Sequence, residues 1–323
     1  MQHVLQQTNQ VRVKVQVKES LKLKMFVILL VLGIFLYVFS RRRGKKLRHR
    51  YPGRYAIVLG ATGGLGTSFC KRLLNEEYSL IVSGRSLQSI NGLINQLNTS
   101  DDKLIPFPYD ASCAAIGNFS TKFNELLTAH AINQDDIAMV IMAAGFGEYS
   151  SFEDTTLEHK LSLLTCDFAF PVEVSDYFYK QFCVRNKTSR KRAALIYISS
   201  CLAVHPGPNF ALYHASKAGV SALASSLYME AGRHCIDVLA VHPGTINDSN
   251  FFQRPEMHFG DLPRTRKLGH TKLLSLTTTQ IVDETFKYLG LCAHLHVGLT
   301  SCMTVALYSL VPRSIICWLI KRK

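Results

Sequence analysis

From Tyr55 onward, short apolar runs alternate with longer stretches in which apolar residues recur every three or four positions. The short runs are continuously apolar, which is typical of strands buried on both faces of a sheet. The predicted strands are Tyr55–Leu59, Ser79–Ser83, Leu104–Phe107, Ile137–Met142, Ala194–Ser199 and Ile236–Val241.

Helical spacing fills the intervals between these strands, near residues 65–76, 86–98, 114–130, 157–184 and 211–233. Strand–helix alternation of this kind predicts an α/β fold, a doubly wound parallel sheet with helices on both faces. We place this domain at residues 54–290. Ligands of such sheets bind at the carboxyl ends of the strands, so the chemistry is expected there.

A different pattern precedes the domain. Residues 25–40 (MFVILLVLGIFLYVFS) are uncharged over 16 positions. About 20 residues span a bilayer comfortably, and flanking basic side chains can snorkel to cover the difference. We interpret this run as a transmembrane anchor. A buried core helix and a cleaved signal peptide are the alternatives, but Arg41-Arg42-Arg43 stands where a small-residue cleavage site would be needed.

Basic residues flank the anchor unequally, with five before it and eight between Arg41 and Arg54. The excess of positive charge after the anchor places the main domain in the cytosol. Residues 1–24 are then a mobile basic tail and residues 41–53 a basic linker. Met1 and Met25 both remain candidates for the start of translation.

The first predicted strand runs into a glycine-rich turn that opens a helical pattern. Glycine lets the backbone approach a pyrophosphate, and the amides at the helix N-terminus point at its charge. Ordinary turns also use glycine, so the position between strand and helix is what favours nucleotide binding. The candidate cofactor-binding residues of this turn are Gly60, Thr62, Gly63, Gly64, Leu65 and Gly66.

The second predicted strand is followed by Gly84-Arg85-Ser86, with no acidic residue. An acid at this position binds the ribose hydroxyl of NAD, whereas an arginine accommodates the 2′-phosphate of NADP. Arg85 therefore favours NADP(H) over NAD(H), although a solvated loop arginine is the alternative interpretation.

Three residues with acid–base potential follow the fifth strand. Ser200 ends it, Tyr213 comes thirteen residues later and Lys217 four after that. Tyr213 and Lys217 lie one helical turn apart, so their side chains share a face. A nearby ammonium stabilises phenolate and is expected to lower the tyrosine pKa, which suits proton exchange with a carbonyl oxygen. A Tyr-x-x-x-Lys pair alone is common on amphipathic helices.

In this order and spacing, the glycine turn, Ser200, Tyr213-x-x-x-Lys217 and the later Pro243-Gly244 resemble the short-chain dehydrogenase/reductase family. The resemblance covers residues 54 to about 290 and extends to membrane-anchored members similar to hydroxysteroid dehydrogenases and 3-ketoacyl reductases. It implies a Rossmann fold and hydride transfer on an alcohol or ketone. It also implies that Ser200, Tyr213 and Lys217 are catalytic.

The resemblance further implies a set of cofactor contacts. Tyr213 and Lys217 would face the nicotinamide ribose, and an acid after the third strand would contact the adenine. The remaining implied contacts are Asp110 at the adenine, Ala144 and Gly145 at the end of the family's Asn-Asn-Ala-Gly segment, and Pro243, Gly244 and Ile246 around the nicotinamide amide. The single anchor and the usual location of related membrane-anchored enzymes favour the endoplasmic reticulum, with a bacterial inner membrane as the alternative.

Three departures from the family pattern count against assigning the family's activity directly to this chain. Leu59 stands where threonine is usual, and Met142-Ala143 replaces two asparagines. The helix asparagine of the proton relay is expected near Thr165 or Cys166, and neither is asparagine. A catalytically weak or inactive nucleotide-binding scaffold or sensor on the same fold is therefore the alternative to an active enzyme.

Composition and residue spacing argue against several other functional classes. The net charge is +14, but its largest basic block adjoins the apolar run, which fits a membrane flank better than a nucleic-acid site. Nine cysteines form no Cys-x-x-Cys pair, and the histidines lack metal-ligand spacing, so no metal site is expected. No G-x-S-x-G surrounds Ser200, which disfavours a serine hydrolase. The histidines near the site in sequence are His205, His214, His234 and His242.

Two late segments bear on the substrate. Residues 244–270 are polar with three phenylalanines and resemble the family's lid. Residues 291–323 are hydrophobic again, but His294 and His296 make a poor spanning helix, so a membrane-surface helix or a buried C-terminal helix is expected. We therefore expect a lipophilic small-molecule substrate, such as a fatty acyl, steroid or retinoid carbonyl, delivered from the membrane. The sequence leaves open whether the protein forms a homodimer.

Overall fold

The computed structural model describes residues 46–99, 101–113, 117–204, 207–248 and 275–311, with positions 314, 315 and 318. Residues 1–45, which hold the predicted tail, the anchor and the start of the linker, lie outside this part. So do His205, residues 249–274 of the predicted lid, and the basic end of the chain. Among the described residues, no helix combines the length and the apolar character needed to cross a bilayer.

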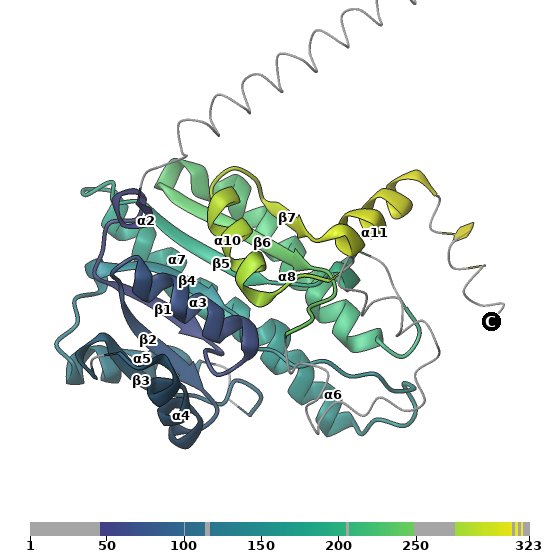
Figure 1. The fold of residues 1–323 in the computed structure, drawn as a ribbon, viewed down its shortest axis with the longest axis horizontal. Coiled ribbons are helices and arrows are strands. Elements are labelled where there is room, and N and C mark those ends of the chain that lie inside the picture. The colour runs from purple at the N-terminus through teal and green to yellow at the C-terminus, as the bar shows by residue number, and fades with distance from the viewer. Residues whose placement is uncertain are drawn as a thin grey trace, which may run out of the picture. The chain divides into compact units, whose positions relative to one another are not determined.

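Seven parallel strands form one sheet in the order β3-β2-β1-β4-β5-β6-β7 (Figure 1). The order runs outward from β1 in one direction and from β4 in the other, so the topological switch point lies between these two strands. The strands are β1 (Tyr55–Leu59), β2 (Ser79–Gly84), β3 (Leu104–Pro108), β4 (Ile137–Met142), β5 (Ala193–Ile198), β6 (Ile236–Pro243) and β7 (His294–Val297).

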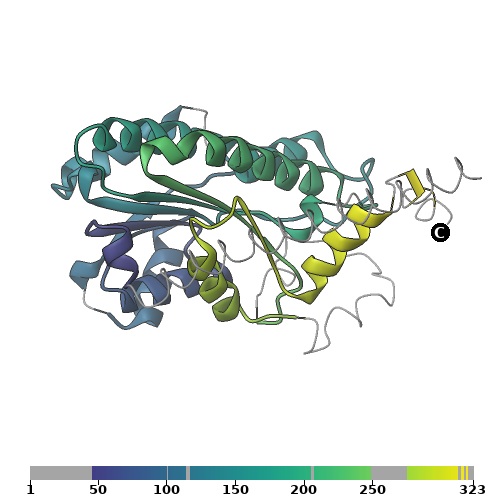
Figure 2. The same cartoon turned by 90° about the horizontal axis from the view of Figure 1, so that it is seen from above.

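Helices cover both faces of the sheet, and Figure 2 shows them as layers above and below it. Successive residues of β1 pack against helices on opposite faces of the sheet. Ile57 and Leu59 pack in the core with α5, α7 and α8, whereas Ala56 and Val58 pack with α3, α4 and α10. The helices are α2 (Leu47–Arg50), α3 (Gly64–Asn75), α4 (Leu87–Leu97), α5 (Asn118–Ala129), α6 (Leu157–Leu164), α7 (Phe170–Asn186), α8 (Ala211–Ala231), α10 (Thr278–Tyr288) and α11 (Leu299–Leu310).

The six predicted strands are confirmed, β1 and β4 to the residue and the others to within two residues at each end. The single helix predicted over 157–184 differs in one respect. A π-helical turn, Thr165–Ala169, separates α6 from α7. A π turn inserts an extra residue and changes which side chains face a given neighbour.

Both ends of the domain extend beyond the predicted limits of 54 and 290. Before residue 54, Leu47 and Tyr51 are buried in the core, and the Tyr51 hydroxyl donates a 2.7 Å hydrogen bond to Asp237 Oδ2. After residue 290, β7 pairs with β6. Leu295 and Val297 are its buried positions and alternate with histidines, so this part of the tail is a strand and not a helix.

Candidate active site

Two adjoining cavities lie at the carboxyl ends of the strands, around the switch point between β1 and β4. Gly63, Ala143 and Gly145 line both of them. The first cavity extends toward the ends of β2 and β3, and the second toward β5, β6 and α8. This is where an open parallel sheet binds its ligands.

Backbone forms the wall of the first cavity at the β1–α3 turn. Gly60 has a φ of +80°, and a Cβ there would lie 2.4 Å from the Ala144 nitrogen. A Cβ on Gly66 would lie 2.2 Å from the Gly60 carbonyl oxygen. These glycines are required because α3 and the β4 loop approach the turn at distances that leave no room for a side chain.

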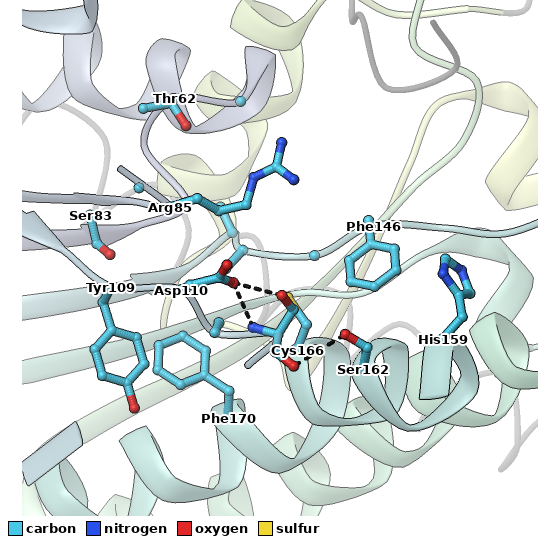
Figure 3. Close-up of a pocket in the computed structure, with 18 residues that line it drawn as sticks. Thr62, Ser83, Arg85, Tyr109, Asp110, Phe146, His159, Ser162, Cys166 and Phe170 are labelled. Atoms are coloured by element: carbon cyan, nitrogen blue, oxygen red, sulfur yellow. Dashed lines mark hydrogen bonds between the residues drawn. The ribbon is translucent and has the colours of Figure 1, made fainter. Parts of the chain in front are cut away.

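Side chains from β2 and β3 close the other end of the first cavity. Arg85 is exposed and lines it, as does Asp110, whose Oδ1 accepts hydrogen bonds from the Ser112 nitrogen at 3.0 Å and hydroxyl at 2.6 Å. Figure 3 shows Arg85 pointing toward the side where Thr62 lies, with Tyr109 and Phe170 on the opposite side.

These residues fit a dinucleotide. The glycine cradle, Gly60 to Gly66, is packed so closely at Gly60 and Gly66 that a Cβ would collide with backbone, and it presents backbone to the cavities. Helix α3 begins at Gly64 with no acidic residue in its first turn. Its N-terminal amides therefore meet no competing carboxylate. The two cavities share a wall at Gly145, so one extended ligand can occupy both.

The second cavity brings the predicted catalytic residues together. Ser200 follows β5 and caps a short 3₁₀ turn, its Oγ accepting from the Leu202 nitrogen at 3.1 Å. Tyr213 and Lys217 project from one face of α8, with Lys217 Nζ 5.6 Å from the centre of the Tyr213 ring. All three are buried, and the Tyr213 hydroxyl is hydrogen-bonded to the Ser200 side chain.

Asp167 is a site residue that the sequence reasoning missed. It lies in the π-helical turn, is completely buried, and places Oδ2 3.1 Å from Lys217 Nζ. Its Oδ1 accepts the Phe146 N–H at 2.9 Å. Lys217 Nζ also donates to the Ile198 carbonyl at 3.3 Å. Asp167 thus lies one or two residues after Thr165 and Cys166, near which the sequence placed the relay residue.

Burial and charge act together on these groups. Burial raises the pKa of Tyr213 above its ordinary value, Lys217 opposes this, and Asp167 reinforces it. The sequence-based expectation of a lowered tyrosine pKa is thus wrong for the protein alone, because the effect of burial exceeds that of the ammonium. Burial disfavours the Lys217 ammonium, yet the Asp167 carboxylate and Tyr213 outweigh it and raise the pKa of Lys217.

A histidine chain supports Ser200 from behind. The Ser200 carbonyl can only accept, so His242 Nδ1 donates the 3.1 Å hydrogen bond between them. Burial lowers the pKa of His242 to about 3, which keeps the ring neutral and leaves Nε2 to accept from His294 Nδ1 at 2.9 Å. His242 therefore positions the backbone of Ser200. The described residues hold no group of three histidine, cysteine or carboxylate side chains able to bind a metal.

All predicted cofactor and catalytic residues line these two cavities. The first is lined by Gly60, Thr62, Gly63, Arg85, Asp110, Ala144 and Gly145. The second is lined by Gly63, Gly64, Leu65, Gly66, Gly145, Ser200, Tyr213, Lys217, Pro243, Gly244 and Ile246.

The geometry agrees with a sequence comparison. Residues 54–257 match the profile of the family described as short chain dehydrogenase. The chain belongs to the short-chain dehydrogenase/reductase family. It is 23% identical over 247 residues to a 7beta-hydroxysteroid dehydrogenase of Mediterraneibacter gnavus, covering 76% of this chain and 85% of that one. Over 248 residues it is 21% identical to the 17-beta-hydroxysteroid dehydrogenase type 3 of Mus musculus, covering 76% and 72%.

Solved structures share the fold. A structure from a study of 7beta-hydroxysteroid dehydrogenase stereoselectivity superposes with a TM-score of 0.69 at 19% identity, over 86% of this chain and 100% of that one. A 3-ketoacyl-(acyl-carrier-protein) reductase from Brucella melitensis superposes with a TM-score of 0.61 at 16% identity, over 73% and 90%. As a member of this family, the protein is an oxidoreductase that acts on CH–OH groups with NAD(P)(H).

Proposed function

We propose that the protein interconverts a carbonyl and an alcohol on a lipophilic substrate with NADP(H). The observation that carries this proposal is the grouping of Ser200, Tyr213 and Lys217 in a cavity that adjoins the glycine cradle. When bound, the nicotinamide supplies or accepts the hydride. Gly60 to Gly66 would hold its pyrophosphate, and Pro243 to Ile246 would hold the nicotinamide end.

Proton transfer is the task of Tyr213. In reduction its hydroxyl donates a proton to the carbonyl oxygen, and in oxidation it takes the proton from the alcohol. The Ser200 hydroxyl hydrogen-bonds the same substrate oxygen and orients it. Lys217 stabilises the phenolate left after donation, while Asp167 fixes the position of the ammonium by its 3.1 Å ion pair.

The cofactor preference rests on Arg85. It lines the first cavity beside Gly84 and Thr62, and neither the end of β2 nor the Ser86 that follows supplies a carboxylate. A guanidinium can pair with a 2′-phosphate through charge-assisted hydrogen bonds, whereas the unphosphorylated ribose gives it no charge to bind.

The substrate class rests on the second cavity and the relatives. Leu202, Phe210 and Ile246 give this cavity an apolar lining next to Tyr213. The relatives named as hydroxysteroid dehydrogenases act, by those names, on hydroxysteroids. A steroid, retinoid or fatty acyl carbonyl suits an apolar lining of this kind.

Cellular placement is part of the proposal. Residues 25–40 anchor the chain in a single pass, and the positive flank at Arg41–Arg54 keeps the catalytic domain cytosolic, at the endoplasmic reticulum. Four sequons, at Asn98, Asn118, Asn186 and Asn247, report on this topology. In eukaryotic cells a glycosidase-sensitive shift in mobility would contradict the cytosolic placement.

Cofactor binding tests the NADP assignment. NADPH and NADH binding, followed by cofactor fluorescence, is expected to favour NADPH in the wild type. Arg85→Ala should weaken NADPH binding on the order of 10- to 100-fold, the effect of one charge-assisted contact, and leave NADH binding unchanged. Arg233→Ala is the matched control, because Arg233 is exposed and precedes the amino end of β6, in the opposite half of the sheet from β2.

Equal binding of NADPH and NADH in the wild type would contradict the assignment to NADP. Tight NADPH binding without turnover of any ketone in a broad panel would favour the scaffold or sensor alternative.

A further inference from the structure

Helix α11 packs against the domain through its polar side chains. The Ser301 hydroxyl is buried and donates to the His242 carbonyl at 2.9 Å. Thr300 Oγ1 accepts the Thr245 N–H at 3.2 Å. Hydrogen bonds to loop and strand backbone therefore fix the side of the helix that faces the domain.

The opposite side of α11 is exposed and apolar. Leu299, Met303 and Leu307 are 49%, 58% and 51% exposed and lie four residues apart, so they form one stripe. Cys302 and Ala306 are also exposed and fill the gaps within it. A helix on a protein surface normally turns its polar face to water. This helix does the reverse, which indicates that an apolar medium or partner covers the stripe.

Helix α11 itself lies next to the substrate end of the site. Gly244, which lines the second cavity, approaches α11 so closely that a Cβ on it would lie 2.0 Å from Thr300 Oγ1. The helix also contacts the 3₁₀ turn Cys201–Ala203 that follows Ser200. Figures 1 and 2 show α11 projecting from the β7 edge of the sheet.

We propose that the exposed stripe of α11 lies on the surface of a lipid bilayer and holds the mouth of the second cavity against it. With 12 residues the helix is too short to span a membrane, and residues 291–312 contain no Asp, Glu, Lys or Arg. The apolar surface continues at Ile315 and Trp318, which are 48% and 52% exposed. The final Lys321-Arg322-Lys323 then matches anionic headgroups.

A bilayer fits these features better than a second copy of the chain would. An interface that closes against protein needs complementary pockets, whereas lipid accepts a smooth apolar stripe with an aromatic residue and basic groups beside it. The inference rests on the proposed function in one respect, because a lipophilic substrate dissolved in that bilayer would enter the cavity beside α11 without crossing water.

Trp318 is the only tryptophan in the chain, so it provides a native probe of this contact. The full chain is reconstituted in phosphatidylcholine–phosphatidylserine vesicles, with and without brominated acyl chains. We expect blue-shifted tryptophan emission in the vesicles and strong quenching by the brominated lipid. The double variant Met303→Glu, Leu307→Glu should lose at least half of that quenching, because carboxylates resist entry into lipid.

Met229→Glu is the matched control, since Met229 is 77% exposed on α8, away from α11, and its replacement should leave the quenching unchanged. Quenching that persists in the double variant would overturn the proposal. Blue-shifted emission without lipid, insensitive to bromine, would assign the stripe to a protein contact and overturn it too. Reduction of a water-soluble ketone by NADPH, measured on the same samples, tests the proposed function separately and should not differ between the variants.

Discussion

At the β1–α3 turn the site is walled by backbone, whereas at α8 it is walled by side chains that carry charge. Gly60 and Gly66 leave no space for a Cβ, and Arg85, which lines the first cavity, is exposed. At the other end Lys217 and Asp167 form an ion pair that is almost completely removed from water. The glycine turn depends on close backbone approach, whereas the α8 end depends on buried charges.

This difference separates the effects that substitutions should have. A change at the backbone end alters space, so cofactor binding should respond first. A change at the side-chain end leaves a buried charge without its partner, so stability and the pH dependence of the rate should respond as well. Each of the following variants acts on one end of the site.

The largest effect is expected for Asp167→Ala. It leaves the Lys217 ammonium buried without its carboxylate and removes the acceptor of the Phe146 N–H, which should lower the free energy of unfolding by about 3–5 kcal/mol. Asp176→Ala is the control, because Asp176 forms an exposed pair with Lys180 that contributes about 0.5 kcal/mol or less. Urea denaturation that gave the two variants equal losses would contradict the buried-charge account.

A smaller loss of stability with a complete loss of cofactor binding is expected for Gly60→Ala. The positive φ costs on the order of 1–3 kcal/mol in a residue with a side chain, and the new Cβ would overlap the Ala144 backbone. NADPH titration and thermal unfolding measure the two effects. Gly92→Ala is the control. It should leave NADPH binding unchanged and raise stability slightly, since no atom lies within 4 Å of its Cβ and alanine favours the α4 helix.

Asp167→Asn should alter the pH dependence of the rate. Ketone reduction needs protonated Tyr213, so it persists below the pKa of Tyr213 and falls as pH rises through it. Burial raises this pKa, Lys217 opposes the rise, and Asp167 adds to it. Removing the carboxylate charge should therefore move the alkaline fall of kcat/KM for reduction to lower pH. A pH profile that moved to higher pH, or did not move, would exclude an electrostatic effect of Asp167 on Tyr213.

The same contrast shows what a sequence can predict. The β1 and β4 limits follow from continuous apolar runs, and the glycine turn from its place between strand and helix. β7 was missed because His294 and His296 interrupt the apolar pattern, although their alternation with Leu295 and Val297 is a strand signal. Short strands at a sheet edge depend on their neighbour, here β6, which a local pattern does not contain.

Asp167 shows a second limit. The family pattern places the relay residue near Thr165 or Cys166, but Asp167, in the π-helical turn, is the residue that contacts Lys217. The pKa of Tyr213 shows a third limit of prediction from sequence. The spacing correctly indicated that Lys217 lowers it, while burial, which exceeds that effect, depends on packing from several elements. The exposed apolar stripe of α11 likewise appears only once hydrogen bonds of Ser301 and Thr300 with the backbone of His242 and Thr245 have fixed the orientation of that helix.

Tyr213→Phe tests the central claim most directly, because it removes one hydroxyl from the second cavity and leaves the glycine cradle intact. Ketone reduction is measured by NADPH oxidation, and NADPH binding is measured on the same preparation. The account predicts that kcat falls at least 100-fold, the contribution of a general acid, while the NADPH Kd stays within about twofold. A variant that bound NADPH normally and kept near-wild-type kcat would contradict the assignment of Tyr213 as the proton donor.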